Sequence, residues 1–271
     1  MKKIVLTSLL AMFAVSGVHA ANIIDGNPLY MPKAGHFYSE TTLGSHTDNV
    51  DVVGLGEEFG YGITDRLSVA GMVVLSEDDW FHAAEWDAMG IGLTYRFVDN
   101  AHWKWDVMGS YAVGPVWSAG GHKFLHGSFL DKHDTEYDWT VGLRTGYTEG
   151  DFTIAGHVMM DYYNTESFNW DHKGFHTLNA GLDAQLVLTD KWNLVAGAEY
   201  EKSLNRYNDF LGSWELMFGA NYNIDATKYI GAFITKDVQH IHTQALNGVQ
   251  QDGHWEFQDG FGIGARFGID F

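Results

Sequence analysis

The end of the chain carries the pattern that most restricts its fold. From Phe261 to Phe271, apolar or aromatic side chains alternate strictly with glycines and charged side chains. This alternation matches a β-strand, whose successive side chains point to opposite faces, and it does not match a helix, whose apolar positions recur every three or four residues. One face of this strand is therefore apolar, and the other face is small or polar.

The start of the chain indicates export. Lys2 and Lys3 precede an apolar run from Ile4 to Val15, and Val18-His19-Ala20 follows as a small-residue cleavage site. This order is typical of a secretory signal peptide, so we predict that residues 1–20 are removed before Ala21. No later window approaches the run of about 18 apolar residues that a transmembrane helix needs. Two classes remain: a soluble exported protein and a β-barrel.

The composition favours the barrel. The chain has no cysteine, so no disulfide framework supports a small secreted fold. Aromatic residues make up 15% of the chain, and there are 32 glycines but only 3 prolines. The formal net charge of −19 argues against nucleic acid as a partner.

The alternation that ends on Phe271, together with the signal peptide, resembles the closing strand of bacterial outer-membrane β-barrels. The resemblance is to that broad, porin-like class and to no specific family. It implies an all-β, transmembrane, antiparallel up-and-down β-barrel in the outer membrane of a Gram-negative bacterium. It also implies contacts with outer-membrane lipids and lipopolysaccharide, and an assembly machinery that reads Phe271 as a signal.

Alternating segments recur along the rest of the chain and predict about twelve strands in one domain, residues 35–271. The predicted strands are 35–45, 50–63, 67–76, 85–97, 103–113, 137–147, 152–162, 175–188, 192–203, 213–224, 228–237 and 257–271. Short turns alternate with loops, and the long loops include 114–136, 163–174, 204–212 and 238–256. Short turns at one end and long loops at the other are the barrel signature, with the short turns periplasmic. A secreted β-sandwich also has alternating strands, but its strands are usually shorter.

Aromatic residues gather at the ends of the predicted strands, as in the two interfacial girdles of a membrane barrel. Two strands fit less well. On 50–63, Glu57 falls on the lipid face with Phe59 and Tyr61. On 228–237, either the set with Tyr229 or the set with Ile230 could face outward, so the sequence leaves this register open. Tyr229 also lies near a predicted periplasmic turn, where an outer-girdle aromatic is expected.

The inward positions carry the predicted function. The predicted pore-lining residues are Glu58, Arg96, Asp106, Arg144, His157, Asp161, Asp183, Glu199, Glu215 and Arg266. One wall of the lumen is mostly acidic, which favours cations over anions. The opposite wall is nearly bare, because it consists largely of glycines such as Gly60, Gly92 and Gly264. Those glycines either permit bending of the sheet or mark the close approach of another segment.

Residues 21–34 form an N-terminal arm before the barrel. Pro28 and Pro32 make it an extended, non-strand segment. It either folds back along the glycine wall as a plug or extends into the periplasm, and loop 114–136 is a second segment able to dip inward.

We predict a channel that passes small neutral or cationic solutes by passive diffusion, without a cofactor. The alternative is a closed barrel that binds surface partners through its long loops. An enzyme such as a lipid hydrolase ranks third, because His126-Gly127-Ser128 has no orienting carboxylate or amide that the sequence identifies. His122, His126 and His133 are weak candidates for metal ligands, and solvated loop histidines explain them more simply.

Overall fold

The structure is a computed structural model, and it describes residues 26–46, 49–78, 84–115, 135–164, 175–204, 210–242 and 255–271. The predicted signal peptide and most of loop 114–136 lie outside the described residues. Among the described residues, no helix has the length and apolar character that crossing a membrane requires.

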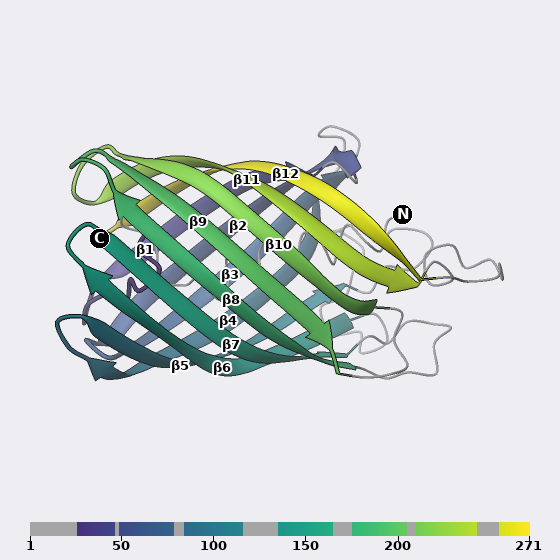
Figure 1. The fold of residues 1–271 in the computed structure, drawn as a ribbon, viewed down its shortest axis with the longest axis horizontal. Coiled ribbons are helices and arrows are strands. Elements are labelled where there is room, and N and C mark those ends of the chain that lie inside the picture. The colour runs from purple at the N-terminus through teal and green to yellow at the C-terminus, as the bar shows by residue number, and fades with distance from the viewer. Residues whose placement is uncertain are drawn as a thin grey trace.

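Twelve antiparallel strands form one closed sheet (Figure 1). They are β1 Phe37–His46, β2 Asn49–Thr64, β3 Leu67–Asp78, β4 Ala84–Asp99, β5 Trp103–Pro115, β6 Thr135–Glu149, β7 Phe152–Asn164, β8 Phe175–Val187, β9 Trp192–Ser203, β10 Phe210–Asn223, β11 Lys228–His242 and β12 Trp255–Asp270. Each strand pairs with its sequence neighbours, and β1 pairs with β12 to close the barrel. The predicted up-and-down barrel is confirmed.

The two ends of the barrel differ (Figure 1). The connections at one end, which we call the turn end, are two to four residues long. The longer connections lie at the other, the loop end, where β1 and β2 are nevertheless joined by only two residues. The sequence builds the tight turns from local hydrogen bonds. Asn100 Oδ1 accepts from the backbone N–H of Trp103 at 2.8 Å, and Gly150 takes a positive φ of 57°. The start of β1 meets the end of the last strand at the turn end, where Phe271 N donates to Phe37 O at 2.7 Å.

The main error in the predicted boundaries concerns loop 238–256. β11 continues to His242 and β12 begins at Trp255, so this loop is shorter than predicted. Val238 pairs with Asp259, and the rings of His240 and Phe257 stack with centroids 4.4 Å apart. Strands that continue past the hydrocarbon region need no apolar face, so their alternation is weaker there.

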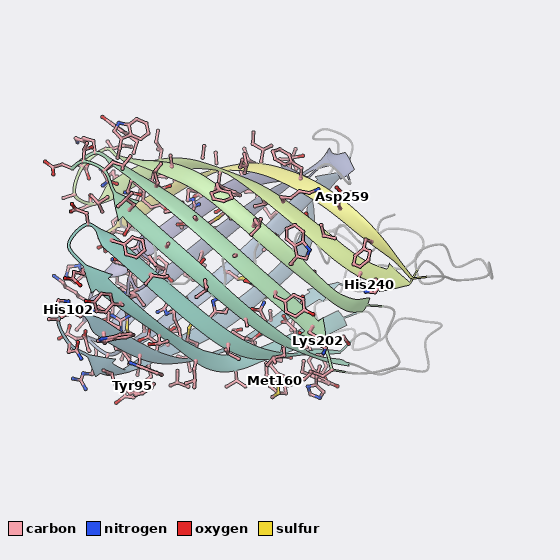
Figure 2. The ribbon with its side chains drawn as sticks, in the orientation of Figure 1. Tyr95, His102, Met160, Lys202, His240 and Asp259 are labelled. Carbon is pink, nitrogen blue, oxygen red and sulfur yellow. The ribbon has the colours of Figure 1, made fainter. Side chains whose placement is uncertain are left out.

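The outer face is apolar in its middle and aromatic at both ends. Figure 2 shows side chains that project outward around the barrel, with Tyr95 near the turn end and Met160 on the outer face. Exposed aromatics near the turn end are Tyr95, Phe97, Trp103, Trp105 and Trp192, and those near the loop end are Tyr111, Tyr200 and Trp214. This distribution matches two interfacial girdles.

The two uncertain strands now have a register. Ile230 and Ile234 are exposed on the outside of β11, and Tyr229 is buried at 1% exposure inside the barrel. The prediction that Tyr229 belongs to the outer girdle is therefore wrong. On β2, Glu57 lies on the outer face between Leu55 and Phe59, and its carboxylate accepts from Ser39 Oγ at 2.5 Å and Thr41 Oγ1 at 2.6 Å. Those two hydroxyls partly satisfy a charge that faces lipid.

Candidate functional site

The candidate site is the lumen, because charged side chains line its wall on most of the strands. All the residues predicted to face the lumen lie at inward positions of their strands. These are Glu58 on β2, Arg96 on β4, Asp106 on β5, Arg144 on β6, His157 and Asp161 on β7, Asp183 on β8, Glu199 on β9, Glu215 on β10 and Arg266 on β12. The structure gathers eight of them into three groups along the wall, while Glu58 lies beside Tyr38 and Arg266 lies beside Met217 and Phe233.

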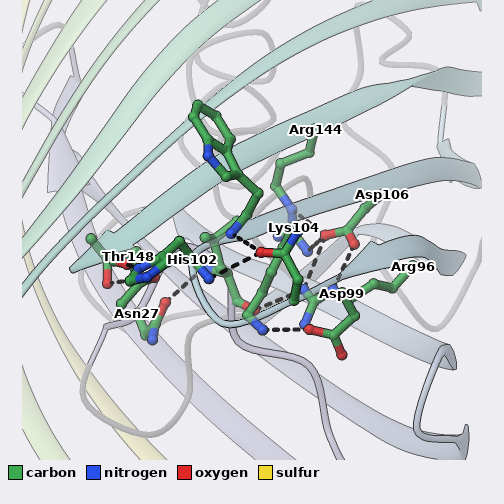
Figure 3. A network of polar contacts seen from close by, with 12 residues as sticks. Asn27, Arg96, Asp99, His102, Lys104, Asp106, Arg144 and Thr148 are labelled. Carbon is green, nitrogen blue, oxygen red and sulfur yellow. Dashed lines mark hydrogen bonds and ion pairs between the residues drawn. The ribbon is translucent and has the colours of Figure 1, made fainter. Parts of the chain in front are cut away.

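The first group is an ion-pair triad in the half of the lumen nearer the turn end (Figure 3). Asp106 receives Arg96 Nε at 2.8 Å and Arg144 Nη2 at 2.5 Å. The three residues are at most 5% exposed. Asp106 is cross-strand partner to both arginines, so the register itself assembles the triad. Burial makes the desolvation of these charges expensive, and their mutual pairing offsets that cost.

The triad also reaches the N-terminal arm. Arg96 Nη2 donates to the carbonyl oxygen of Leu29 at 2.8 Å. Leu29 is 2% exposed, and Pro28 and Pro32 are fully buried. Burial also raises the pKa of the Tyr30 hydroxyl well above its ordinary value, and the nearby charge of Asp270 adds to the effect. Residues 26–32 of the arm therefore pack inside the barrel wall.

The second group surrounds His157. His157 Nε2 lies 3.0 Å from Asn179 Oδ1 and 3.6 Å from Glu199 Oε2, and Nδ1 lies 3.8 Å from Asp183 Oδ2. Asn179 in turn donates to Glu199. Next to this group, Asp161 accepts from Thr140 Oγ1 at 2.6 Å. These contacts link β6 to β9 through polar side chains.

The third feature is a row of acids in the half of the lumen nearer the loop end. Glu215 on β10 is the direct cross-strand partner of Glu199 on β9 and of Asp237 on β11. Directly opposed side chains have Cβ atoms about 4.5–5.5 Å apart, and like charges at that distance repel. Among the described inward residues of this half there is no lysine or arginine. Asn179 and His157 contact Glu199 at one end of this row, and the row as a whole carries more acids than arginines or lysines.

The glycine-rich wall is not bare, which corrects the prediction. The Tyr38 ring covers Gly60, and the Phe233 ring covers Gly264, so that a Cβ at either glycine would overlap the ring. Tyr38 Oη donates to Glu58 Oε1 at 2.5 Å. Tyr229 Oη donates to Glu40, the cross-strand partner of Glu58. The glycines here provide room for large side chains that lie flat against the sheet.

Sequence reasoning missed several inward residues. Tyr38 and Glu40 lie on β1, where alternation is weak, and Tyr229 lies on β11, where both alternating sets are apolar. Asp237 lies at the end of the predicted strand, where the pattern fades. The alternation from Tyr229 through Thr235 to Asp237 is the signal that identifies this inward set.

The other sequence candidates are not joined to this site. Among the described residues, no group of three or more His, Asp or Glu side chains is arranged to hold a metal ion. The candidate ligands His122, His126 and His133, and the pairing of His126 with Ser128, lie outside the described residues.

No protein-family model matches this sequence. No curated protein matches it either. Solved structures do match in fold. The NanC porin aligns over 84% of this chain and 98% of its own, with a TM-score of 0.54 at 12% identity. The KdgM porin, solved in complex with disordered oligogalacturonate, aligns over 86% of this chain and 99% of its own, with a TM-score of 0.55 at 8% identity.

A third structure widens the comparison beyond porins. The translocator domain of the autotransporter NalP from Neisseria meningitidis aligns over 100% of this chain and 98% of its own, with a TM-score of 0.56 at 13% identity. Similarity at this level of identity concerns the fold and not the activity. The closed sheet and these alignments together show that the chain has the fold of the bacterial outer-membrane β-barrels.

Proposed function

We propose that this protein is an outer-membrane channel that passes small neutral or cationic solutes by diffusion. In this proposal the turn end lies in the periplasm and the loop end faces outward. The apolar belt between two aromatic girdles supports a membrane location. The fold likeness to two porins, NanC and KdgM, supports a transport role for the lumen.

The acid row carries the cation preference. Glu199, Glu215 and Asp237 lie directly opposite one another on β9, β10 and β11, and His157 lies 3.6 Å from Glu199. A row of carboxylates inside a low-dielectric wall attracts cations and repels anions. The basic inward residues Arg96 and Arg144 lie nearer the turn end, where both pair with Asp106. The charge of the lumen is thus mixed at one end and acidic at the other.

Reversal potentials across a planar bilayer in a salt gradient test this function. The wild-type barrel is expected to conduct and to prefer cations at low salt, and high salt weakens the preference by screening. Replacing two members of the row, Glu199→Gln with Glu215→Gln, is expected to reduce the cation preference by about an order of magnitude. The matched control is Asp259→Asn, because Asp259 lies near the loop end on the outer face and pairs with Lys236. An unchanged preference in the double variant would contradict the proposal.

A second candidate is a closed barrel that binds surface partners through its loops. Burial of Asp106 at 0% exposure and of the described arm inside the turn end favours this function. A closed barrel does not conduct, so the same bilayer measurement separates the two candidates.

A further inference from the structure

The N-terminal arm is attached to β2 where it enters the barrel. Ala34 forms a parallel bridge with Gly62, and Gly35 N donates to Gly62 O at 2.8 Å. Gly62 N donates in turn to His36 O at 3.0 Å. A Cβ at position 62 would overlap the backbone of Lys33, so glycine is required for the arm to lie this close. Residues 33–36 therefore fix the start of the arm against the wall.

From there the arm reaches the other side of the lumen. The Leu29 methyls lie 2.7 Å from the place that a Cβ at Gly146 of β6 would occupy. Gly26 lies against Val195 of β9 and Asn221 of β10, since a Cβ at Gly26 would overlap both side chains. In the closed strand order, β9 is seven strands from β2 in one direction and five in the other. The arm therefore spans the lumen at its turn end.

The conformation of the arm is compact and locally stabilised. Asn27 Oδ1 accepts from Leu29 N at 2.8 Å, and Asn27 O accepts from Tyr30 N at 3.0 Å. The fixed φ of each of the two buried prolines limits the alternatives open to the free segment. Tyr30 packs edge-on against Tyr38, with ring centroids 6.2 Å apart. An apolar, proline-stiffened turn thus occupies a section of the lumen next to the charged triad.

One wall side chain connects the arm to the charged triad. Arg96 bonds Asp106 through Nε and Nη2, and it donates to Leu29 O. Arg144 bonds the same carboxylate through Nε at 2.9 Å and through Nη2. The two arginines therefore share Asp106, and Arg96 also donates to the arm. We propose that residues 26–34 form a plug that closes the turn end of the lumen, and that Arg96 is its latch. This inference rests on the proposed channel function and adds its regulation.

Cysteine labelling tests the latch without any transport measurement. The chain contains no cysteine, so Leu29→Cys introduces a single thiol. It is expected to react with a water-soluble maleimide about tenfold or more slowly than His36→Cys, because a buried site reacts through local opening. Adding Arg96→Gln is expected to raise the rate at position 29 about tenfold, the effect of losing one charge-assisted hydrogen bond.

The matched control for the latch is Arg144→Gln. It removes the other guanidinium from Asp106 and leaves the bond to Leu29 in place. Labelling at position 29 should stay slow in this variant. Equal labelling at positions 29 and 36 in the parent protein would overturn the plug. An equal increase from Arg96→Gln and Arg144→Gln would overturn the latch. Heat-modifiable migration on gels checks that each variant has folded.

Conductance tests whether the seated arm closes the lumen. Deleting residues 27–33 is expected to raise single-channel conductance by about twofold or more, because the narrowest section is widened. Replacing those residues with a Gly-Ser segment of the same length should act in the same direction. If the deletion variant conducts only as much as the parent, although position 29 of the parent labels slowly, the plug is overturned and the channel function stands. Absence of conductance in both the parent and the deletion would overturn the channel function, and the labelling contrast would then decide whether Arg96 holds the arm.

Discussion

The imidazole of His157 on β7 occupies the space that a side chain at position 181 of β8 would need. A Cβ at Gly181 would lie 2.7 Å from His157 Nε2 and closer still to the neighbouring ring carbon. The same fit relates Tyr38 to Gly60, so large inward side chains lie flat over glycines of the adjacent strand. A lumen lined in this way keeps charged groups at the wall and leaves its axis less crowded.

Adding one methyl group at position 181 should therefore destabilise the barrel. Gly181→Ala forces the ring of His157 to move, and we expect the free energy of unfolding to fall by about 1–3 kcal/mol. The matched control is Gly92→Ala, also inward, where the nearest atom to a new Cβ is 3.7 Å away. That variant should be stabilised by about 0.5–1 kcal/mol, because alanine has less freedom to lose. Urea unfolding in lipid vesicles, followed by tryptophan fluorescence, measures both; equal effects would contradict the fit.

The fold was predictable because lipid and water impose opposite demands on the two faces of each strand. The alternation from Tyr137 to Tyr147 identified β6 and its outward set without any knowledge of its neighbours. The pattern failed where this demand ends, as at His240 and Phe257, since both faces of a strand contact water there. It was also ambiguous on β11, where Tyr229 and Ile230 are both apolar and only the pairing with β12 decides which faces inward.

Breaking the triad at its centre should be costly. Asp106→Asn leaves the buried guanidinium groups of Arg96 and Arg144 without their shared carboxylate, and we expect a loss of about 3–5 kcal/mol in stability. Lys104→Gln is the control, because its pair with Asp99 is partly exposed and such pairs contribute about 0–1 kcal/mol. The same vesicle unfolding assay compares the two. Similar losses would show that burial does not strengthen the triad.

The lipid-facing carboxylate of Glu57 should lower stability. Gln at this position keeps a hydrogen-bond acceptor for Ser39 or Thr41 and removes the charge. We expect Glu57→Gln to raise the free energy of unfolding in vesicles by about 1 kcal/mol. Glu149→Gln, at an exposed strand end, should have no comparable effect. A clear loss of stability in Glu57→Gln would indicate that the charge at this depth has a partner that requires it.

The terminal aromatic should matter for assembly in cells. Phe271 is 67% exposed, so replacing it changes little packing. If the assembly machinery reads Phe271, Phe271→Asp should reduce the amount of folded, heat-modifiable barrel in the outer membrane several-fold. Phe271→Tyr, which keeps an aromatic ring, should keep that amount at the parent level. Refolding of the Asp variant into vesicles without the machinery serves as the control and should be near normal. Equal defects in both settings would assign the residue a structural role instead.

The lumen was less predictable than the outer face. The charged inward residues could be identified from alternation, since each strand gives its own set. Their grouping could not, because it depends on which residues lie opposite each other on neighbouring strands. The pair of Asp106 and Arg144 follows from the β5–β6 register, and the row of Glu199 and Glu215 follows from that of β9 and β10. The contact of Leu29 with Gly146 joins residues too far apart in sequence for any local pattern to reveal it.

Because β1 pairs with β12, the barrel cannot close until β12 has been synthesised. The first strand of the sheet finds one of its two partners in the last strand of the sheet, and Phe37 exchanges backbone hydrogen bonds with Phe271. Until then, any sheet that has formed has two unsatisfied edges, which invite pairing with other chains. Such a chain is expected to need protection from pairing with other chains until β12 joins β1. A chain without β12 would leave one edge of β1 and one edge of β11 unpaired, and it could close into a smaller barrel only if those two edges paired with each other.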